Sequence, residues 1–100
     1  MGNARKTVLR LLTRLENSGS YSNILLDEGL ERSELSPQDK KFAAALFYGV
    51  LERQITLDNI IREYSRNPKN KLGTEVRVIL RMGLYQLLYM DSVPDNAAGG

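Results

Sequence analysis

Apolar residues recur every three or four positions along almost the whole chain, the spacing that gathers them on one face of an α-helix. The first segment shows this pattern clearly, because its apolar residues are Ala4, Val8, Leu11, Leu12 and Leu15. A β-strand needs alternation of apolar and polar residues, and no stretch of the sequence has it. The pattern therefore predicts an all-α fold.

Capping and stop signals divide the pattern into about five helices. The clearest start is Ser36 before Pro37, because a serine hydroxyl caps backbone amides and proline suits the first helical position. Asp39 then places a carboxylate near the positive end of the helix. The other boundaries are an N-cap at Asn3, a stop at residues 17–20, a bend or break at residues 53–56, a stop at Asn67-Pro68 and an N-cap at Thr74. We expect a compact bundle of helices at residues 4–16, 21–32, 37–52, 57–64 and 75–90.

Glycine inside a helix costs about 1 kcal/mol relative to alanine, and Gly49 and Gly83 both lie inside expected helices. Gly49 lies on an apolar arc, so it marks either a close approach by another helix or a local weakness. The segment 75–90 is apolar almost all the way round, which is typical of a central, buried helix. We place Gly83 on its most buried side, together with Val76, Leu80 and Leu87.

The chain has no cysteine and no histidine. These absences exclude disulfides, thiol nucleophiles, Cys/His zinc sites and Ser-His-Asp triads, and they remove the side chain that most often transfers protons near neutral pH. Carboxylate chemistry, hard-metal binding, lysine chemistry or no chemistry at all remain open. We expect no catalytic residue, no metal and no cofactor in this chain.

Membrane and export signals are also missing from the sequence. The most apolar segment, residues 76–90, contains Arg77 and Arg81 and is shorter than the ~20 residues of a membrane span. Charges run through residues 1–14, whereas a secretory signal needs an unbroken apolar stretch. We expect a soluble, cytoplasmic protein without a membrane partner.

Charge is unevenly distributed although the net charge is only +2. Residues 1–20 carry four Lys or Arg against one acid, residues 21–65 five against eight, and residues 66–100 five against three. Basic ends around an acidic middle suggest a surface that faces a polyanion, although an ordinary solvated surface is the alternative. The strongest candidate for phosphate binding is a stripe on the first helix, formed by Lys6, Arg10 and Arg14 with Arg5 to the side.

A second candidate basic patch lies later in the chain. Its members are Lys69, Lys71, Arg77 and Arg81. Arginines on a mostly buried helix often pair with acids, here with residues such as Glu52 or Glu63, so the patch has a purely structural alternative.

Aromatic and acidic residues supply further candidates. Tyr48, Tyr85 and Tyr89 could stack on unpaired bases, but the one-turn spacing of Tyr85 and Tyr89 on an apolar helix favours core or half-buried packing. The dense carboxylate cluster, which could bind a hard cation but is more typical of a solvated face, consists of Asp27, Glu28, Glu31 and Glu34.

The segment 76–90 (VRVILRMGLYQLLYM), followed by 93–98 (VPDNAA), resembles the signature helix and turn of the NusB family, a helical RNA-binding fold. Residues 21–23 (YSN), 39–41 (DKK) and 47–51 (FYGVL) are more similar to the NusB-like N-terminal domain of the bacterial ribosomal RNA cytosine-C5 methyltransferases of the RsmB/Sun/Fmu family. The resemblance implies a non-catalytic domain that helps an enzyme dependent on S-adenosyl-L-methionine (SAM) bind small-subunit ribosomal RNA. Its implied partners are ribosomal RNA and the catalytic domain of the same parent chain, and SAM belongs to that catalytic domain.

The end of the chain departs from the family, which continues with Val-Asn-Glu and another helix where this sequence has Gly99-Gly100. We expect residues 1–98 to be one truncated NusB-like RNA-binding domain lacking its C-terminal helices, and residues 99–100 to be a cloning scar. Truncation would leave an apolar patch or cause self-association through Val76, Leu80, Leu84 and Leu87. The alternative functions are a free-standing NusB-type transcription antitermination factor and a helical protein-interaction module.

Overall fold

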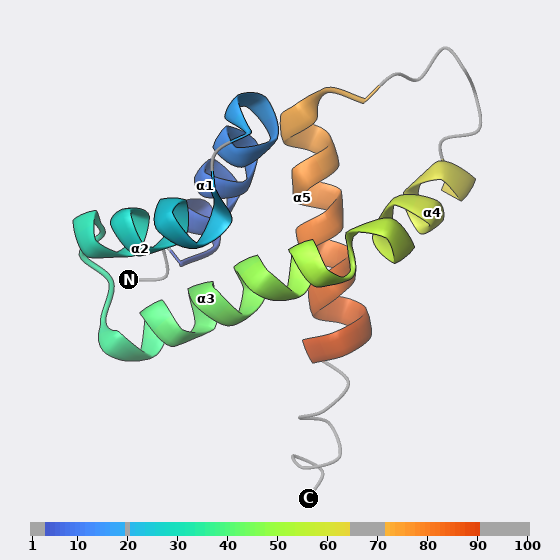
Figure 1. Ribbon diagram of the computed structural model, residues 1–100. Helices are drawn as coiled ribbons and strands as arrows, with labels where there is room; N and C mark the ends of the chain where they lie inside the picture. The colour runs from blue at the N-terminus through green and yellow to red at the C-terminus, as the bar shows by residue number, and fades with distance from the viewer. Residues whose placement is uncertain (1–3, 20, 65–71, 91–100) are drawn as a thin grey trace, which may run out of the picture. The chain divides into compact units, whose positions relative to one another are not determined.

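The structure is a computed structural model that describes residues 4–19, 21–64 and 72–90, apart from the side chain of Tyr64 (Figure 1). Over these ranges it contains five α-helices, one π-helical segment and no strand, which confirms the all-α prediction. The helices are α1 (Ala4–Ser18), α2 (Ser22–Arg32), α3 (Pro37–Glu52), α4 (Gln54–Tyr64) and α5 (Thr74–Tyr85), and the π-helical segment is η1 (Gln86–Met90).

The chain divides into two units, Met1–Tyr48 and Gly49–Gly100. The boundary lies within α3, so the first unit contains α1, α2 and the first part of α3. The second unit contains the end of α3 together with α4, α5 and η1.

In the first unit α1 packs against α2 through one apolar face of each helix. Gly29 of α2 lies directly against Leu11 of α1, because a Cβ added at Gly29 would lie 2.6 Å from a δ-carbon of Leu11. Each fully buried leucine or valine side chain stabilises the fold by about 1.5–3 kcal/mol relative to the same side chain in water. The buried residues of the pair are Ala4, Thr7, Val8, Leu11, Leu12, Leu25 and Leu26.

A glycine turn joins α1 to α2. Gly19 has a φ of 69°, a left-handed conformation that glycine adopts without steric cost, and its N–H donates to the Leu15 carbonyl at 2.9 Å. The predicted stop at residues 17–20 is therefore confirmed for Gly19, whereas Ser20 lies outside the described residues. Tyr21 follows as the N-cap residue of α2.

The start of α3 follows the predicted capping pattern. The Ser36 hydroxyl accepts a hydrogen bond from the Asp39 N–H at 3.1 Å, and Asp39 lies in the first turn. Farther along α3, Ala43, Leu46 and Phe47 are completely buried. The serine cap and the apolar arc were both readable from the sequence.

In the second unit Gly49 lies directly beside Tyr85. A Cβ added at Gly49 would clash with the phenol end of that ring and would lie 2.6 Å from its Cε2. The predicted close approach of another helix is confirmed, and the approaching helix is α5. The bend or break predicted at residues 53–56 is confirmed only at Arg53, the single residue between α3 and α4, so α4 begins at Gln54 and not at residue 57.

The orientation of α5 differs from the prediction. Val78, Arg81 and Met82 are its buried residues, whereas Val76, Leu80 and Leu87 are 46%, 40% and 61% exposed. Placing Gly83 on the most buried side was wrong, because it is exposed and nothing lies within 4 Å of the Cβ position there. A helix that is apolar nearly all round carries no signal for its buried face, so neighbouring helices decide it.

Both ends of α5 also differ from the prediction. Gly73, not Thr74, is the N-cap residue. Its backbone is extended, and because glycine has no side chain it makes no side-chain capping hydrogen bond. The α-helix ends at Tyr85, and residues 86–90 form η1 instead of continuing the helix to Met90. The Gln86 side-chain amide donates to the Met82 carbonyl at 3.1 Å at the point where η1 begins.

Several sequence predictions fall on residues outside the described ranges. These are the cap at Asn3, the stop at Asn67-Pro68, the turn at 93–98 and the departure from the family pattern at Gly99-Gly100. Among the helices of the described ranges, none has the length and apolarity needed to cross a membrane.

Gly49 and Gly83, both within helices, give a matched pair of stability tests. We expect Gly49→Ala to lower the free energy of unfolding by about 1–3 kcal/mol, because the added methyl group would displace Tyr85 from its place beside α3. We expect Gly83→Ala to raise it by about 0.5–1 kcal/mol, because the site is open and alanine favours the helix. Urea unfolding followed by circular dichroism measures both, and equal effects of the two substitutions would contradict the packing.

Candidate nucleic-acid interface

The predicted basic stripe is present on the exposed face of α1. Lys6, Arg10 and Arg14 are all exposed, and they lie on the side of the helix away from buried Val8. This separation follows from the four-residue spacing of the cations. The helix therefore presents a row of positive charge to solvent.

Arg5 has a different environment from the rest of the predicted stripe. Its guanidinium carbon lies 5.1 Å from the centroid of the Phe42 ring of α3, a cation–π geometry. The residue is still exposed, but its side chain lies against α3.

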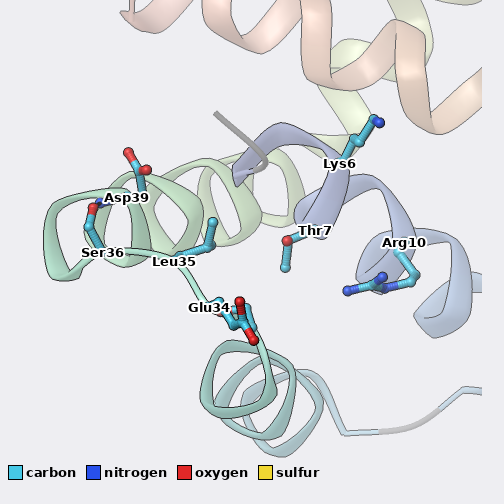
Figure 2. A pocket seen from close by; sticks show the side chains of 8 residues that line it. Lys6, Thr7, Arg10, Glu34, Leu35, Ser36 and Asp39 are labelled. Atoms are coloured by element: carbon cyan, nitrogen blue, oxygen red, sulfur yellow. Dashed lines mark hydrogen bonds between the residues drawn. The ribbon is translucent and has the colours of Figure 1, made fainter. Parts of the chain in front are cut away.

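A cavity of about 610 Å³ opens beside the stripe (Figure 2). Figure 2 shows Thr7 and Arg10 on α1 directed toward the connection from α2 to α3 that carries Glu34, whereas the Lys6 side chain, at the rim, points away from it. The cavity thus has a cationic side, a carboxylate side and several hydroxyl groups. Its lining is completed by Ser33, Leu35, Ser36 and Asp39.

Two further cavities continue along the α1–α2 pair. One, of about 140 Å³, is lined by Arg10, Arg14 and Arg32 together with Glu28. The other, of about 380 Å³, is lined by Arg14, Tyr21, Ile24, Leu25, Glu28 and Arg32. Within the part of the chain that the structure describes, no ion pair engages the guanidiniums of Arg10, Arg14 or Arg32. We call Lys6, Arg10, Arg14 and Arg32 the basic face.

Arg32 and Tyr21 are the functional candidates that sequence reasoning missed. Arg32 lies in the last turn of α2, after an acidic stretch. The count of charges over residues 21–65 was negative, so it did not point to this arginine. The signal that would have found it is the short turn at Gly19. Such a turn sends α2 back along α1, and the contact of Gly29 with Leu11 confirms that later residues of α2 meet earlier residues of α1.

The second predicted patch is not assembled in the described residues. Lys69 and Lys71 lie outside them, and Arg77 is half-buried. Arg81 is 5% exposed, and its Nε and Nη2 donate to the two carboxylate oxygens of Asp58 at 2.7 and 3.0 Å. The prediction of Arg81 as an RNA contact is corrected accordingly, because its hydrogen-bonding edge is already turned to α4. The structural alternative of an acid partner is confirmed, with Asp58 in place of Glu52 or Glu63.

Two tyrosines of the second unit, Tyr85 and Tyr89, pack together. Tyr85 and Tyr89 are half-buried and stacked, with ring centroids 5.1 Å apart and planes at 30°. The guanidinium carbon of Arg53 lies 4.9 Å from the Tyr89 centroid. The prediction of half-buried packing is confirmed for both. Tyr48, in the first unit, is 43% exposed and meets Phe47 edge-on at 5.5 Å.

The carboxylate cluster, which lies on α2 and the connection that follows it, is a solvated face. Asp27, Glu28, Glu31 and Glu34 are all exposed. Among the described residues, no group of three or more potential ligands could hold a metal ion. Glu28 and Glu34 instead contribute to the cavities beside the basic face.

The sequence matches the NusB family model over residues 2–98. The chain therefore belongs to the NusB family, an all-α, RNA-binding family. The matched residues form this domain, and no methyltransferase catalytic domain lies among them.

The similar proteins are of two kinds. A probable ribosomal RNA small subunit methyltransferase B of Synechocystis sp. is 39% identical over 98 residues, which are 98% of this chain and 22% of that protein. The one of Bacillus subtilis is 36% identical over 94 residues, or 94% of this chain and 21% of that protein. The transcription antitermination protein NusB of Campylobacter jejuni is 32% identical over 89 residues, covering 88% of this chain and 67% of that protein.

The chain thus spans about a fifth of the length of the methyltransferase relatives. No solved structure gave a significant match.

The ion pair of Asp58 with Arg81 gives a test of the second unit. We expect Asp58→Asn to lower the free energy of unfolding by about 3 kcal/mol, because it leaves a buried guanidinium without its counter-charge. The control is Arg62→Ala, which removes an exposed hydrogen bond to Asn59 and is expected to stay within about 0.5 kcal/mol of the parent. Chemical denaturation compares the two, and an unchanged midpoint for Asp58→Asn would show that the pair contributes nothing.

Proposed function

We propose that this chain is the non-catalytic RNA-binding domain of a small-subunit ribosomal RNA cytosine-C5 methyltransferase. The observation that carries the proposal is the basic face, where four exposed cations border three cavities that share lining residues, in a member of an RNA-binding family. The relatives that are 39% and 36% identical support the methyltransferase context.

Binding would begin with the phosphates. Lys6, Arg10 and Arg14 form a row along α1, and each phosphate that they neutralise releases condensed counterions. Arg32 extends this row onto α2. Glu28 and Glu34 repel phosphate, so they limit the backbone path to the cationic side of the cavities.

The chemistry would belong to another domain of the parent protein. In that domain SAM would supply the methyl group. The described residues of this chain form no strand, so they contain no glycine-rich turn between a strand and a helix that could hold SAM. The domain would therefore have two partners, ribosomal RNA and the catalytic domain of its own parent chain. A role of this kind implies a location in the bacterial cytoplasm.

A free-standing transcription antitermination factor is the second candidate. It is favoured by the 32% identity to the Campylobacter jejuni NusB protein, of which the chain covers two thirds. The two functions share RNA binding and differ in the protein sequence that comes after the domain. A parent reading frame that continues into a methyltransferase domain supports the first proposal and contradicts the second.

The salt dependence of RNA binding tests the basic face. Four neutralised phosphates predict that log affinity falls with log salt at a slope of about −3. We expect charge reversal at Lys6, Arg10 and Arg14 to remove most of the affinity and most of this slope. The matched control is Lys41→Glu, which reverses an exposed cation on α3 away from the cavities. Affinity for ribosomal RNA fragments unchanged by the triple substitution would refute the basic face as the RNA site.

Protein contact through α5 and η1 is a third candidate, favoured by an exposed apolar surface. Its members are Val76 (46% exposed), Ile79 (48%), Leu80 (40%), Leu87 (61%) and Leu88 (47%). A surface of this kind favours association, either with the catalytic domain or with a second copy of the chain.

Self-association through this surface is measurable by sedimentation velocity. We expect the sedimentation coefficient to rise with protein concentration, and Leu80→Glu with Leu87→Glu to abolish the rise, because both side chains are exposed and apolar. A monomer at every concentration would exclude a second copy as the partner.

A further inference from the structure

Tyr21 is an aromatic residue that the fold does not bury. Its side chain is 77% exposed, compared with 43% for Tyr48, and it makes no capping hydrogen bond although it is the N-cap residue of α2. Its backbone is held in place, because the Tyr21 carbonyl accepts the Leu25 N–H at 3.0 Å. The backbone of Tyr21 is therefore fixed at the start of α2, while its aromatic ring is exposed to solvent.

The surroundings of this ring form a cavity of about 380 Å³, which lies within the range of small-ligand sites. Exposed Ile24 adds apolar surface beside the ring, and Arg14 and Arg32 supply two guanidiniums. Glu28 is the carboxylate of the lining. The cavity therefore combines an exposed aromatic surface with two cations and one hydrogen-bond acceptor.

We infer that this cavity receives one unpaired nucleotide of RNA, with its base stacked on Tyr21 and its flanking phosphates on Arg14 and Arg32. Stacking on an aromatic ring is sequence-tolerant, because every base has a π-face. The Glu28 carboxylate repels phosphate and accepts hydrogen bonds, so it faces an amino edge of the base.

A stacking site at Tyr21 favours single-stranded over duplex RNA. In a duplex the bases are already stacked on each other, and A-form grooves offer side chains mainly backbone and 2′-hydroxyl groups. The phosphate row of Lys6, Arg10 and Arg14 can act on either form. Recognition of an unpaired base at Tyr21 rests on the proposed RNA-binding function and adds a preference that the charges alone do not supply.

The test compares an oligoadenylate of about ten nucleotides with an RNA duplex of the same length. We expect Tyr21→Ala to weaken oligoadenylate binding by roughly 5- to 100-fold and to leave duplex binding unchanged. Tyr21→Phe keeps the ring and should bind as the parent does. Tyr48→Ala removes another exposed tyrosine outside the cavity and should also have no effect.

A spectroscopic readout separates stacking from a loss of structure. The chain contains no tryptophan, so Tyr21→Trp introduces the sole tryptophan at the cavity. We expect its fluorescence to be quenched by oligoadenylate and to respond little to the duplex, while circular dichroism shows unchanged helicity.

The outcomes distinguish this inference from the proposed function. If charge reversal of the α1 cations weakens RNA binding but Tyr21→Ala does not, the basic face stands and the stacking site is overturned. If the charge reversal has no effect, the proposed function fails first. Unquenched tryptophan fluorescence with bound oligoadenylate would also overturn the inference, and it would leave the ring as a surface for a protein partner.

Discussion

The close contact between Leu11 and Gly29 lets α1 and α2 pack through their apolar faces, and this packing positions the charged residues of both helices. Because Gly29 has no side chain, α2 lies close to α1, and the apolar faces of both helices are buried. The polar residues beside these faces are consequently brought to shared cavities, where Arg14 and Arg32 meet. Repulsion between exposed cations amounts to less than about 1 kcal/mol, whereas one buried leucine contributes about 1.5–3 kcal/mol. Apolar packing can therefore assemble a cationic surface that the charges alone would disperse.

Arginine has opposite roles in the two units. Arg81 is buried and engages both carboxylate oxygens of Asp58, so its charge is compensated within the fold. Arg14 and Arg32 border open cavities and have no ion-pair partner among the described residues. Burial with a facing carboxylate makes an arginine structural, and exposure beside a cavity leaves it available for phosphate. The amino-acid composition does not distinguish Arg81 from Arg14 and Arg32, although only the exposed arginines are available to bind phosphate.

Local signals were predictable from the sequence because they depend on neighbours within one turn. The serine cap at Ser36, the glycine stop at Gly19 and the break at Arg53 all belong to this kind. The apolar stripe of α1 also placed Lys6, Arg10 and Arg14 on the exposed face. Gly49 was recognised as a close approach, although the sequence did not name Tyr85 as the residue that approaches. The buried face of α5 was predicted wrongly, because a helix that is apolar nearly all round has no preferred buried face. For the same reason the sequence did not decide whether Arg81 is exposed or buried, and in the structure it is buried.

The sequence by itself determined the helical class, the boundaries of α2 and α3 to within one residue and the cationic row on α1. These follow from residue spacing and backbone capping, which act over three or four positions. Only the tertiary structure decided that Arg32 joins this row, that Tyr21 remains exposed beside it and that Arg81 pairs with Asp58. Each of these depends on which residues of one helix face another, and that pairing is set by side-chain packing between segments distant in the chain.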